Sequence, residues 1–385
     1  MLPVGYCTNV HPGRNLEELR RSLLGPVAEV ARLVGAGPLP VGIWISAEAS
    51  RQMHERPGEA ERLRDAALSR GVQIAAVNAF PYGDFGANAV KTRVYEPHWA
   101  DARRALHTIA VAELLPGLVA PGTRTASVST LPLGWRPRFS AEGCGASVGL
   151  AAAQMEQVTR AFARIEATSG LRITLDVEPE PGCAIQTVGE LAGFTRHCLR
   201  PRDAADPLHR HLGACIDTCH LAVMREDPLE ALHALAEAAL PVHRVQVSAA
   251  LQGRAEEADL AALARFDEPR FLHQVVTGTA ADPRVWADIG DFLGARVGQD
   301  WRCHFHVPIF LDRIGTLQTT ADSIAPCLAE LPRDATPAFV EVETYAWSQL
   351  PDAAAPTLEE GIAREILHAR ALLARAAGSA QACTP

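Results

Sequence analysis

The sequence predicts one (β/α)8 barrel domain. Apolar runs of strand length alternate with segments of helical spacing along most of the 385 residues, as in a parallel sheet whose strands are joined by helices. Eight of these runs are candidates for parallel strands, and no linker or change of composition divides them. Several runs end in carboxylates. Because crossovers between parallel strands are right-handed, we expect these ends to meet at the mouth where barrels build their active sites.

The clearest strand–helix–strand unit lies between residues 171 and 221. Its first strand is expected at 172–177 and its second at 212–216, with a helical segment at 187–199 between them. Both strands finish in acidic residues. The unit therefore predicts neighbouring parallel strands that carry carboxylates to one face of the barrel.

The remaining elements extend the same alternation. Further strands are expected at residues 2–8, 40–46, 72–83, 123–135, 242–250 and 336–347. Further helices are expected at residues 16–34, 58–70, 100–115, 147–168, 228–240, 255–266 and 357–375. Asn15 stands at the N-cap of the first helix, and Glu18 occupies the capping-box position three residues later.

Two apolar runs near the carboxyl end interrupt the alternation. They lie at 270–276 and 301–310, and we interpret them as a hairpin inserted between strands seven and eight. The single domain is expected to cover residues 1–376, with 270–310 as the insertion. Residues 377–385 are expected to be a frayed tail.

Composition narrows the class of protein. The net charge is −9 and no arginine-rich stripe is interleaved with aromatic residues, which disfavours a nucleic acid partner. No apolar run is long enough to cross a bilayer, and the N-terminus lacks the features of a signal peptide, so we expect a cytoplasmic protein with no membrane insertion. The nine cysteines are then expected to be reduced. Lys91 is the only lysine, so Schiff-base chemistry would depend on it.

Polar side chains that could carry chemistry follow five of the expected strands. They are Asn78 and Tyr82 after strand three, Glu178 and Glu180 after strand five, Asp217 and His220 after strand six, Gln246 and Ser248 on strand seven, and Glu341 and Glu343 on strand eight. The expected hairpin adds His273, His304 and His306. A mixed set of carboxylates and imidazoles suits Mn²⁺, Fe²⁺, Mg²⁺ or Zn²⁺, and no thiolate cluster requires zinc.

Strand geometry relates some of these residues to one another. Side chains two positions apart share a face, so His304 and His306 should point the same way, and so should Glu341 and Glu343. Plainer roles stay open. Asp217 could be a helix cap with no further role. The acidic residues after strand five could be a solvated loop end.

Three sequence stretches resemble a known superfamily. LDVEPEPG, CIDTCHLA and VEVETY are similar to the xylose-isomerase-like barrels, which include sugar isomerases, epimerases and endonuclease-IV-type enzymes. The resemblance implies that Glu178, Asp217 and either Glu341 or Glu343 are metal ligands, with Glu343 the better match because a threonine follows it. It implies that His220 is a ligand or a substrate contact.

Within this superfamily the chain is most similar to the EboE family of metabolite traffic proteins. The similar stretches are YCTNVHPG, NAFPYGDF, VKTRVYEPHW, STLPLGW, FDEPRFLHQ, HFHVPIF and EVETYAW, and they span almost the entire chain. This resemblance implies a protein related to sugar-phosphate isomerases and encoded in clusters linked to export of a secondary metabolite.

The chain also departs from the superfamily pattern. Gln246 stands where the superfamily usually has a histidine on strand seven, and His273 or His304 could supply the missing ligand. Asn78 and the STLPLG loop replace the histidines that the endonuclease branch carries on strands three and four. These departures argue against a trinuclear zinc site and against DNA repair.

The predicted function is isomerisation or epimerisation of a sugar, cyclitol or related polyhydroxy metabolite, assisted by a divalent metal. Glu178 and Glu343 would move the proton. The predicted metal ligands are Glu178, Asp217, Glu343, His220, His273 and His304, and the predicted substrate contacts are Asn78, Tyr82, Gln246, His306 and Glu341. The alternatives are a metal-dependent hydrolase, suggested by HFHVP, and a barrel that binds a metabolite without turning it over. A small molecule is the expected partner, and a homodimer is allowed for.

Overall fold

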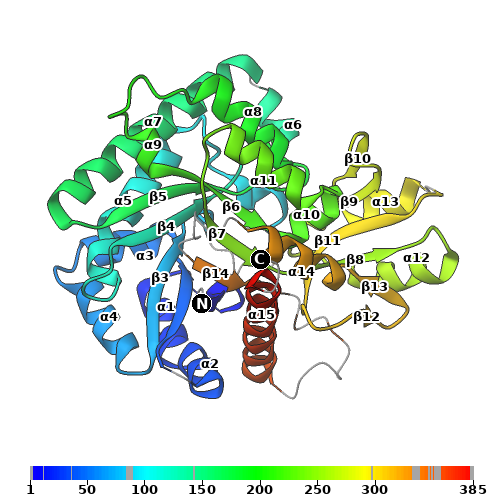
Figure 1. Cartoon of the computed structure of the whole chain (residues 1–385), viewed down its shortest axis with the longest axis horizontal. Coiled ribbons are helices and arrows are strands. Elements are labelled where there is room, and N and C mark those ends of the chain that lie inside the picture. The colour runs from blue at the N-terminus through cyan, green and yellow to red at the C-terminus, as the bar shows by residue number, and fades with distance from the viewer. Residues whose placement is uncertain are drawn as a thin grey trace.

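The computed structural model describes residues 3–11, 13–35, 37–83, 90–141, 144–295, 298–331, 339–345, 347, 350 and 357–381. Eight parallel strands close into a barrel in the order β1-β14-β7-β6-β5-β4-β3-β2 (Figure 1). Their bounds are β1 Val4–Cys7, β2 Leu39–Trp44, β3 Val72–Asn78, β4 Thr125–Thr130, β5 Arg172–Val177, β6 Leu212–Asp217, β7 Val242–Val247 and β14 Phe339–Val342. The predicted (β/α)8 barrel is confirmed.

Helices alternate with these strands and cover the outside of the barrel (Figure 1). Their bounds are α1 Leu16–Leu24, α2 Pro26–Val34, α3 Ala47–His54, α4 Glu59–Leu68, α5 Ala102–Leu118, α6 Arg136–Ala141, α7 Cys144–Ser169, α8 Val188–Cys198, α9 Leu208–His211, α10 Thr218–Met224, α11 Pro228–Glu237, α14 Ile324–Glu330 and α15 Leu358–Gln381. Short 3₁₀ turns lie at η1 Thr8–Val10, η2 Lys91–Tyr95, η3 Ala264–Phe266 and η4 Ala321–Ser323. No helix in the described part of the chain is both long and apolar enough to cross a membrane.

The first predicted helix is two helices. Asn15 caps α1 as expected, because its side chain accepts a hydrogen bond from the backbone N–H of Glu18 at 3.0 Å. The helix then ends at Gly25, and Pro26 begins α2 at the position where a missing N–H costs nothing. The helix α3, which begins behind the Ser46 cap, was not predicted.

The insertion is a six-stranded antiparallel sheet, larger than the predicted hairpin. Its order is β10-β9-β11-β8-β13-β12, and it lies beside the barrel (Figure 1). The bounds are β8 Ala249–Gly253, β9 Val275–Gly278, β10 Pro283–Trp286, β11 Trp301–Val307, β12 Arg313–Ile314 and β13 Leu317–Thr319, with helices α12 Glu257–Leu263 and α13 Ile289–Ala295. The two predicted runs do pair antiparallel, as β9 with β11. They are two strands of this larger sheet.

The interior of the barrel is polar below its mouth. Arg244 on β7 and Glu341 on β14 form an ion pair in which neither side chain is exposed to solvent. Gly42 on β2 makes room for this pair, because a Cβ there would overlap the Glu341 carboxylate. The ion pair lies within the barrel whose strand ends carry the acidic residues of the site.

The carboxyl-terminal helix extends further than expected. α15 continues to Gln381, past position 377 where the frayed tail was predicted to begin. Residues 382–385 of that predicted tail lie outside the described residues.

Candidate metal centre

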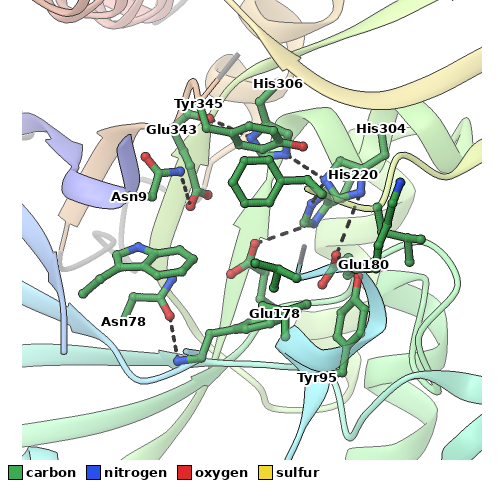
Figure 2. A pocket seen from close by; sticks show the side chains of 17 residues that line it. Asn9, Asn78, Tyr95, Glu178, Glu180, His220, His304, His306, Glu343 and Tyr345 are labelled. Carbon is green, nitrogen blue, oxygen red and sulfur yellow. Dashed lines mark hydrogen bonds and ion pairs between the residues drawn. The ribbon is translucent and has the colours of Figure 1, made fainter. Parts of the chain in front are cut away.

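A cavity at the barrel mouth gathers polar side chains from the strand ends and from the inserted sheet. Figure 2 shows carboxylates, imidazoles and asparagines pointing into this space. Ten labelled residues line it: Asn9, Asn78, Tyr95, Glu178, Glu180, His220, His304, His306, Glu343 and Tyr345. The site is thus shared between the (β/α)8 barrel and β11 of the insertion.

Three carboxylates from three strand ends meet at this mouth. Glu178 follows β5, Asp217 ends β6 and Glu343 follows β14. One oxygen from each of the three lies within 4.8 Å of the others, and all three side chains are buried. Burial and the neighbouring negative charges raise the pKa values of Glu178 and Glu343 well above the usual range.

The Asp217 carboxylate has one oxygen engaged and one free. Its Oδ1 accepts hydrogen bonds from the N–H groups of Cys219 and His220 and from the hydroxyl of Ser248. Asp217 therefore does cap α10, as one interpretation of the sequence expected. Its Oδ2 is buried without a hydrogen-bond partner. A buried carboxylate oxygen without a donor, facing two more carboxylates, fits a bound divalent cation.

Three imidazoles lie next to the carboxylates. The Nε2 atom of His304 lies 3.1 Å from Nε2 of His220 and 2.9 Å from Nε2 of His306. His304 and His306 share one face of β11, as the alternation predicted. Burial and the neighbouring imidazoles lower the pKa of His304 well below its usual value, and burial lowers that of His306 to about 4. His304 and His306 are therefore neutral near pH 7.

Glu180, which follows β5, and Tyr95, on η2, lie beside this cluster. The phenol of Tyr95 donates a hydrogen bond of 2.6 Å to Oε1 of Glu180. Glu180 lies 3.9 Å from Nδ1 of His304, and Glu178 lies 3.6 Å from Nδ1 of His220. Burial raises the pKa of Glu180. The acidic and imidazole sets are therefore in direct contact.

Six of the predicted site residues line the cavity: Asn78, Glu178, His220, His304, His306 and Glu343. Asp217 joins them through the carboxylate set and through a second set with His220 and His306. The side chain of Asn78 also accepts a hydrogen bond of 2.8 Å from the N–H of Phe80, which fixes the turn after β3.

His273 is not placed as a ligand. Its Nδ1 lies 3.1 Å from the backbone oxygen of His304, and its Nε2 lies 3.0 Å from the carboxylate of Glu268. Both ring nitrogens are thereby engaged, and the ring packs on Phe305. The neighbouring residue Gln274 faces the cluster instead, and its Oε1 contacts His304.

Three predicted substrate contacts lie away from the cavity wall. Tyr82 follows the end of β3, and its ring packs against His107 at a centroid distance of 5.3 Å. Glu341 is held by Arg244 inside the barrel. Gln246 accepts a hydrogen bond from the Cys215 thiol at 3.2 Å. Alternation along a strand assigns a side chain to a face but does not set its depth, and for this reason the prediction failed for Gln246 and Glu341.

Several residues of the site were not predicted from the sequence. Asn9 donates a hydrogen bond of 3.3 Å to Glu343, and Gln274 donates to the hydroxyl of Tyr95. Asn9 lies two residues after the end of β1, so the position of strand ends could have identified it. Tyr95 and Gln274 lie on a 3₁₀ turn and in the insertion, where no strand-end rule applies.

Comparison with known proteins supports the architecture. No protein-family model and no curated protein matches the sequence. A putative sugar phosphate isomerase/epimerase from Anabaena variabilis superposes with a TM-score of 0.52 at 15% identity, covering 98% of this chain and 99% of that chain. The superposition agrees with the (β/α)8 barrel.

Two further solved structures superpose over nearly the full length of both chains. A D-psicose 3-epimerase from Clostridium cellulolyticum, solved with D-tagatose, gives a TM-score of 0.51 at 13% identity, covering 97% of this chain and 99% of that chain. An IolI protein with a bound zinc atom gives 0.50 at 11% identity with the same coverage. At such identities the likeness extends to the fold alone.

Proposed function

We propose that this barrel is a divalent-metal-dependent isomerase or epimerase acting on a sugar, cyclitol or related polyhydroxy metabolite. The observation that carries the proposal is the buried, unpartnered Oδ2 of Asp217, which lies in a set with Glu178 and Glu343 at the barrel mouth. These three residues would hold the cation. The xylose-isomerase-like structures similar to this chain include sugar epimerases and a zinc-binding protein, which agrees with this class by analogy of fold.

The cation, when bound, would act as a Lewis acid toward vicinal oxygens of the substrate and acidify the carbon next to a carbonyl. The protein's own contribution is the placement of two carboxyl groups with raised pKa values. Glu178 and Glu343 come from β5 and β14, two strands separated in the barrel by β6 and β7. Burial raises both pKa values, and these two carboxyl groups would take a proton from substrate carbon and return it.

The rest of the cavity suits a polyhydroxy compound. Asn9, Asn78 and His306 offer hydrogen-bonding groups, while Trp44, Phe80 and Tyr345 supply apolar walls. Such a mixture can bind hydroxyl groups and cover the carbon face of a sugar ring. We assign substrate contacts to Asn78 and His306 and withdraw Tyr82, whose ring packs elsewhere.

The finer parts of the proposal depend on sequence resemblance. The EboE stretches support a role in a pathway that makes or exports a secondary metabolite. The cytoplasmic location and the homodimer likewise stay predictions.

Deuterium exchange gives the sharpest test of the chemistry. The metal-loaded protein is incubated in D₂O with a panel of ketohexoses, ketopentoses and keto-cyclitols, and exchange at carbon next to the carbonyl is followed by proton NMR. We expect exchange and a new epimer or isomer with at least one compound. Glu178→Gln and Glu343→Gln should slow exchange about 10²–10⁴-fold, because each removes a proton carrier. Glu237→Gln, at an exposed position on α11, serves as the control.

The outcomes separate the alternatives. A Glu178→Gln protein that keeps both its metal and its exchange rate would refute the assigned role. Hydrolysis of ester or amide substrates without exchange would favour the hydrolase. A tightly bound organic compound that is never altered, in a protein without metal affinity, would favour the non-catalytic binding barrel.

A further inference from the structure

The barrel mouth also holds three imidazoles that the carboxylate site does not use as metal ligands. His220 lies on α10, and His304 and His306 lie on β11 of the insertion. Their Nε2 atoms approach one another at 3.1 Å and 2.9 Å, which are hydrogen-bond distances. A hydrogen bond between two rings requires a proton on one of the nitrogens.

The opposite ring nitrogens determine where those protons are. Nδ1 of His220 lies 2.8 Å from the backbone oxygen of Pro179, and Nδ1 of His306 lies 2.7 Å from the backbone oxygen of Glu343. A carbonyl oxygen only accepts, so both Nδ1 atoms carry the hydrogen. A neutral imidazole has only one N–H, so the neutral form of each of these two rings, with its hydrogen on Nδ1, presents a bare Nε2 atom.

The position of the hydrogen on His304 follows in the same way, from an amide oxygen that contacts its Nδ1. Nδ1 of His304 lies 2.7 Å from Oε1 of Gln274. The orientation of this amide follows from its other end, since Nε2 of Gln274 donates to the backbone oxygen of Pro181 at 2.9 Å and to the hydroxyl of Tyr95 at 3.0 Å. Oε1 must then accept from His304. In their neutral forms the three rings thus direct Nε2 lone pairs toward a shared space, and this is the form in which an imidazole binds a metal.

We propose that His220, His304 and His306 form a second cation site, beside the site of Glu178, Asp217 and Glu343. Imidazoles that donate through Nδ1 to a fixed oxygen and present bare Nε2 atoms have the arrangement found in metal-binding histidines. Nitrogen ligands on a tetrahedral zinc ion lie about 3.3 Å apart, given Zn–N distances near 2.0–2.1 Å. The two spacings from His304, 3.1 Å to His220 and 2.9 Å to His306, differ from this by only a few tenths of an ångström.

The chemistry of the donors indicates the class of cation. Three imidazoles with an adjacent carboxylate suit Zn²⁺ or a similar borderline transition metal, whereas an all-carboxylate set also suits Mg²⁺ and Mn²⁺. Asp217 belongs to both sets, because it also groups with His220 and His306. This inference goes beyond the proposed function, which needs the carboxylate site only, and it makes His306 a metal ligand in place of a substrate contact.

Zinc stoichiometry tests the second site. The purified full-length chain is stripped with a chelator, titrated with ZnCl₂ by calorimetry, and assayed for zinc by mass spectrometry after desalting. The key variant is the double substitution His304→Asn and His306→Asn, because an asparagine amide keeps a donor near the place of Nδ1 and has no counterpart of Nε2. Glu178→Gln with Glu343→Gln removes ligands of the other site, and His233→Asn, at an exposed position on α11, is the control. Circular dichroism verifies that each variant is folded.

We expect about two zinc ions per chain for the unaltered protein and the control, and about one for each double variant. A histidine variant that binds as much zinc as the unaltered protein would overturn the inference. One ion that the histidine variant loses and the carboxylate variant keeps would support the histidine site and contradict the proposed function. One ion with the reverse behaviour would overturn the histidine site alone. No zinc binding at all would overturn both.

X-ray absorption at the zinc edge provides a measurement without any substitution. The unaltered protein loaded with zinc should show outer-shell scattering from imidazole rings. A spectrum with oxygen ligands only would overturn the inference even if every variant failed to fold.

Discussion

Replacing Arg244 by methionine should destabilise the barrel strongly. Neither Arg244 nor Glu341 is exposed, and methionine would leave the carboxylate buried without its counter-charge. The guanidinium also donates to the backbone oxygen of Val77 at 3.0 Å and to the hydroxyl of Ser129 at 2.9 Å. Breaking a buried ion pair from one side typically costs about 3–5 kcal/mol, and these additional hydrogen bonds place the expected loss at the upper end of that range.

Equilibrium unfolding in urea, followed by tryptophan fluorescence and circular dichroism, measures this loss as a fall in the free energy of unfolding. Arg51→Met is the matched control, since Arg51 is about half exposed and pairs with surface glutamates, so it should change stability little. The double variant Arg244→Met with Glu341→Gln should recover part of the loss, because it removes the unpaired charge as well.

The same substitution has a second consequence at the mouth. The positive charge of Arg244 lowers the pKa values of Glu178 and Glu343, and so offsets part of the increase that burial causes. Removing it should therefore shift the acid limb of any pH–rate profile to higher pH. An Arg244→Met protein as stable as the unaltered chain, or a double variant less stable than the single one, would refute the argument from the buried charge.

Three further predictions follow from single contacts. Gly42→Ala should destabilise the fold in urea, because its Cβ would overlap the Glu341 carboxylate, and a neutral effect would show that the ion pair can move aside. Burial raises the pKa of Glu365 to about 8, so the folded protein keeps a proton that the unfolded chain releases near the ordinary value of 4.5. Stability should therefore fall as pH rises from about 4.5 to 8, and Glu365→Gln should flatten that dependence in urea titrations at several pH values. Saturating Mn²⁺ should raise the unfolding free energy by about 2.7 kcal/mol at a hundredfold excess over its Kd, and Asp217→Asn should abolish the increase seen in thermal melts.

The sequence was sufficient to predict the barrel and the meeting of three carboxylates at its mouth. Both depend on local rules: a period of two in strands, a period of 3.6 in helices, and the meeting of parallel strand ends at one face. Glu178, Asp217 and Glu343 were found because each lies at or just after a strand end. His304 and His306 were correctly placed on a shared face by alternation alone.

The failures have identifiable physical causes. β8 follows β7 after a single residue, so the two strands read as one run and the inserted sheet was reduced to a hairpin. Gln274 was not predicted, because the face that a residue beside β9 presents depends on where that strand begins. Arg244 was not predicted at all, because nothing local indicates that an arginine will pair with Glu341 across a closed barrel.

The most direct test of the account is the position of a bound cation. Crystals of the protein soaked in MnCl₂ would be measured at a wavelength where manganese scatters anomalously. The account predicts an anomalous peak within coordination distance of Glu178, Asp217 and Glu343. A saturated crystal in which those carboxylates hold no ion, with any manganese bound elsewhere on the chain, would contradict it.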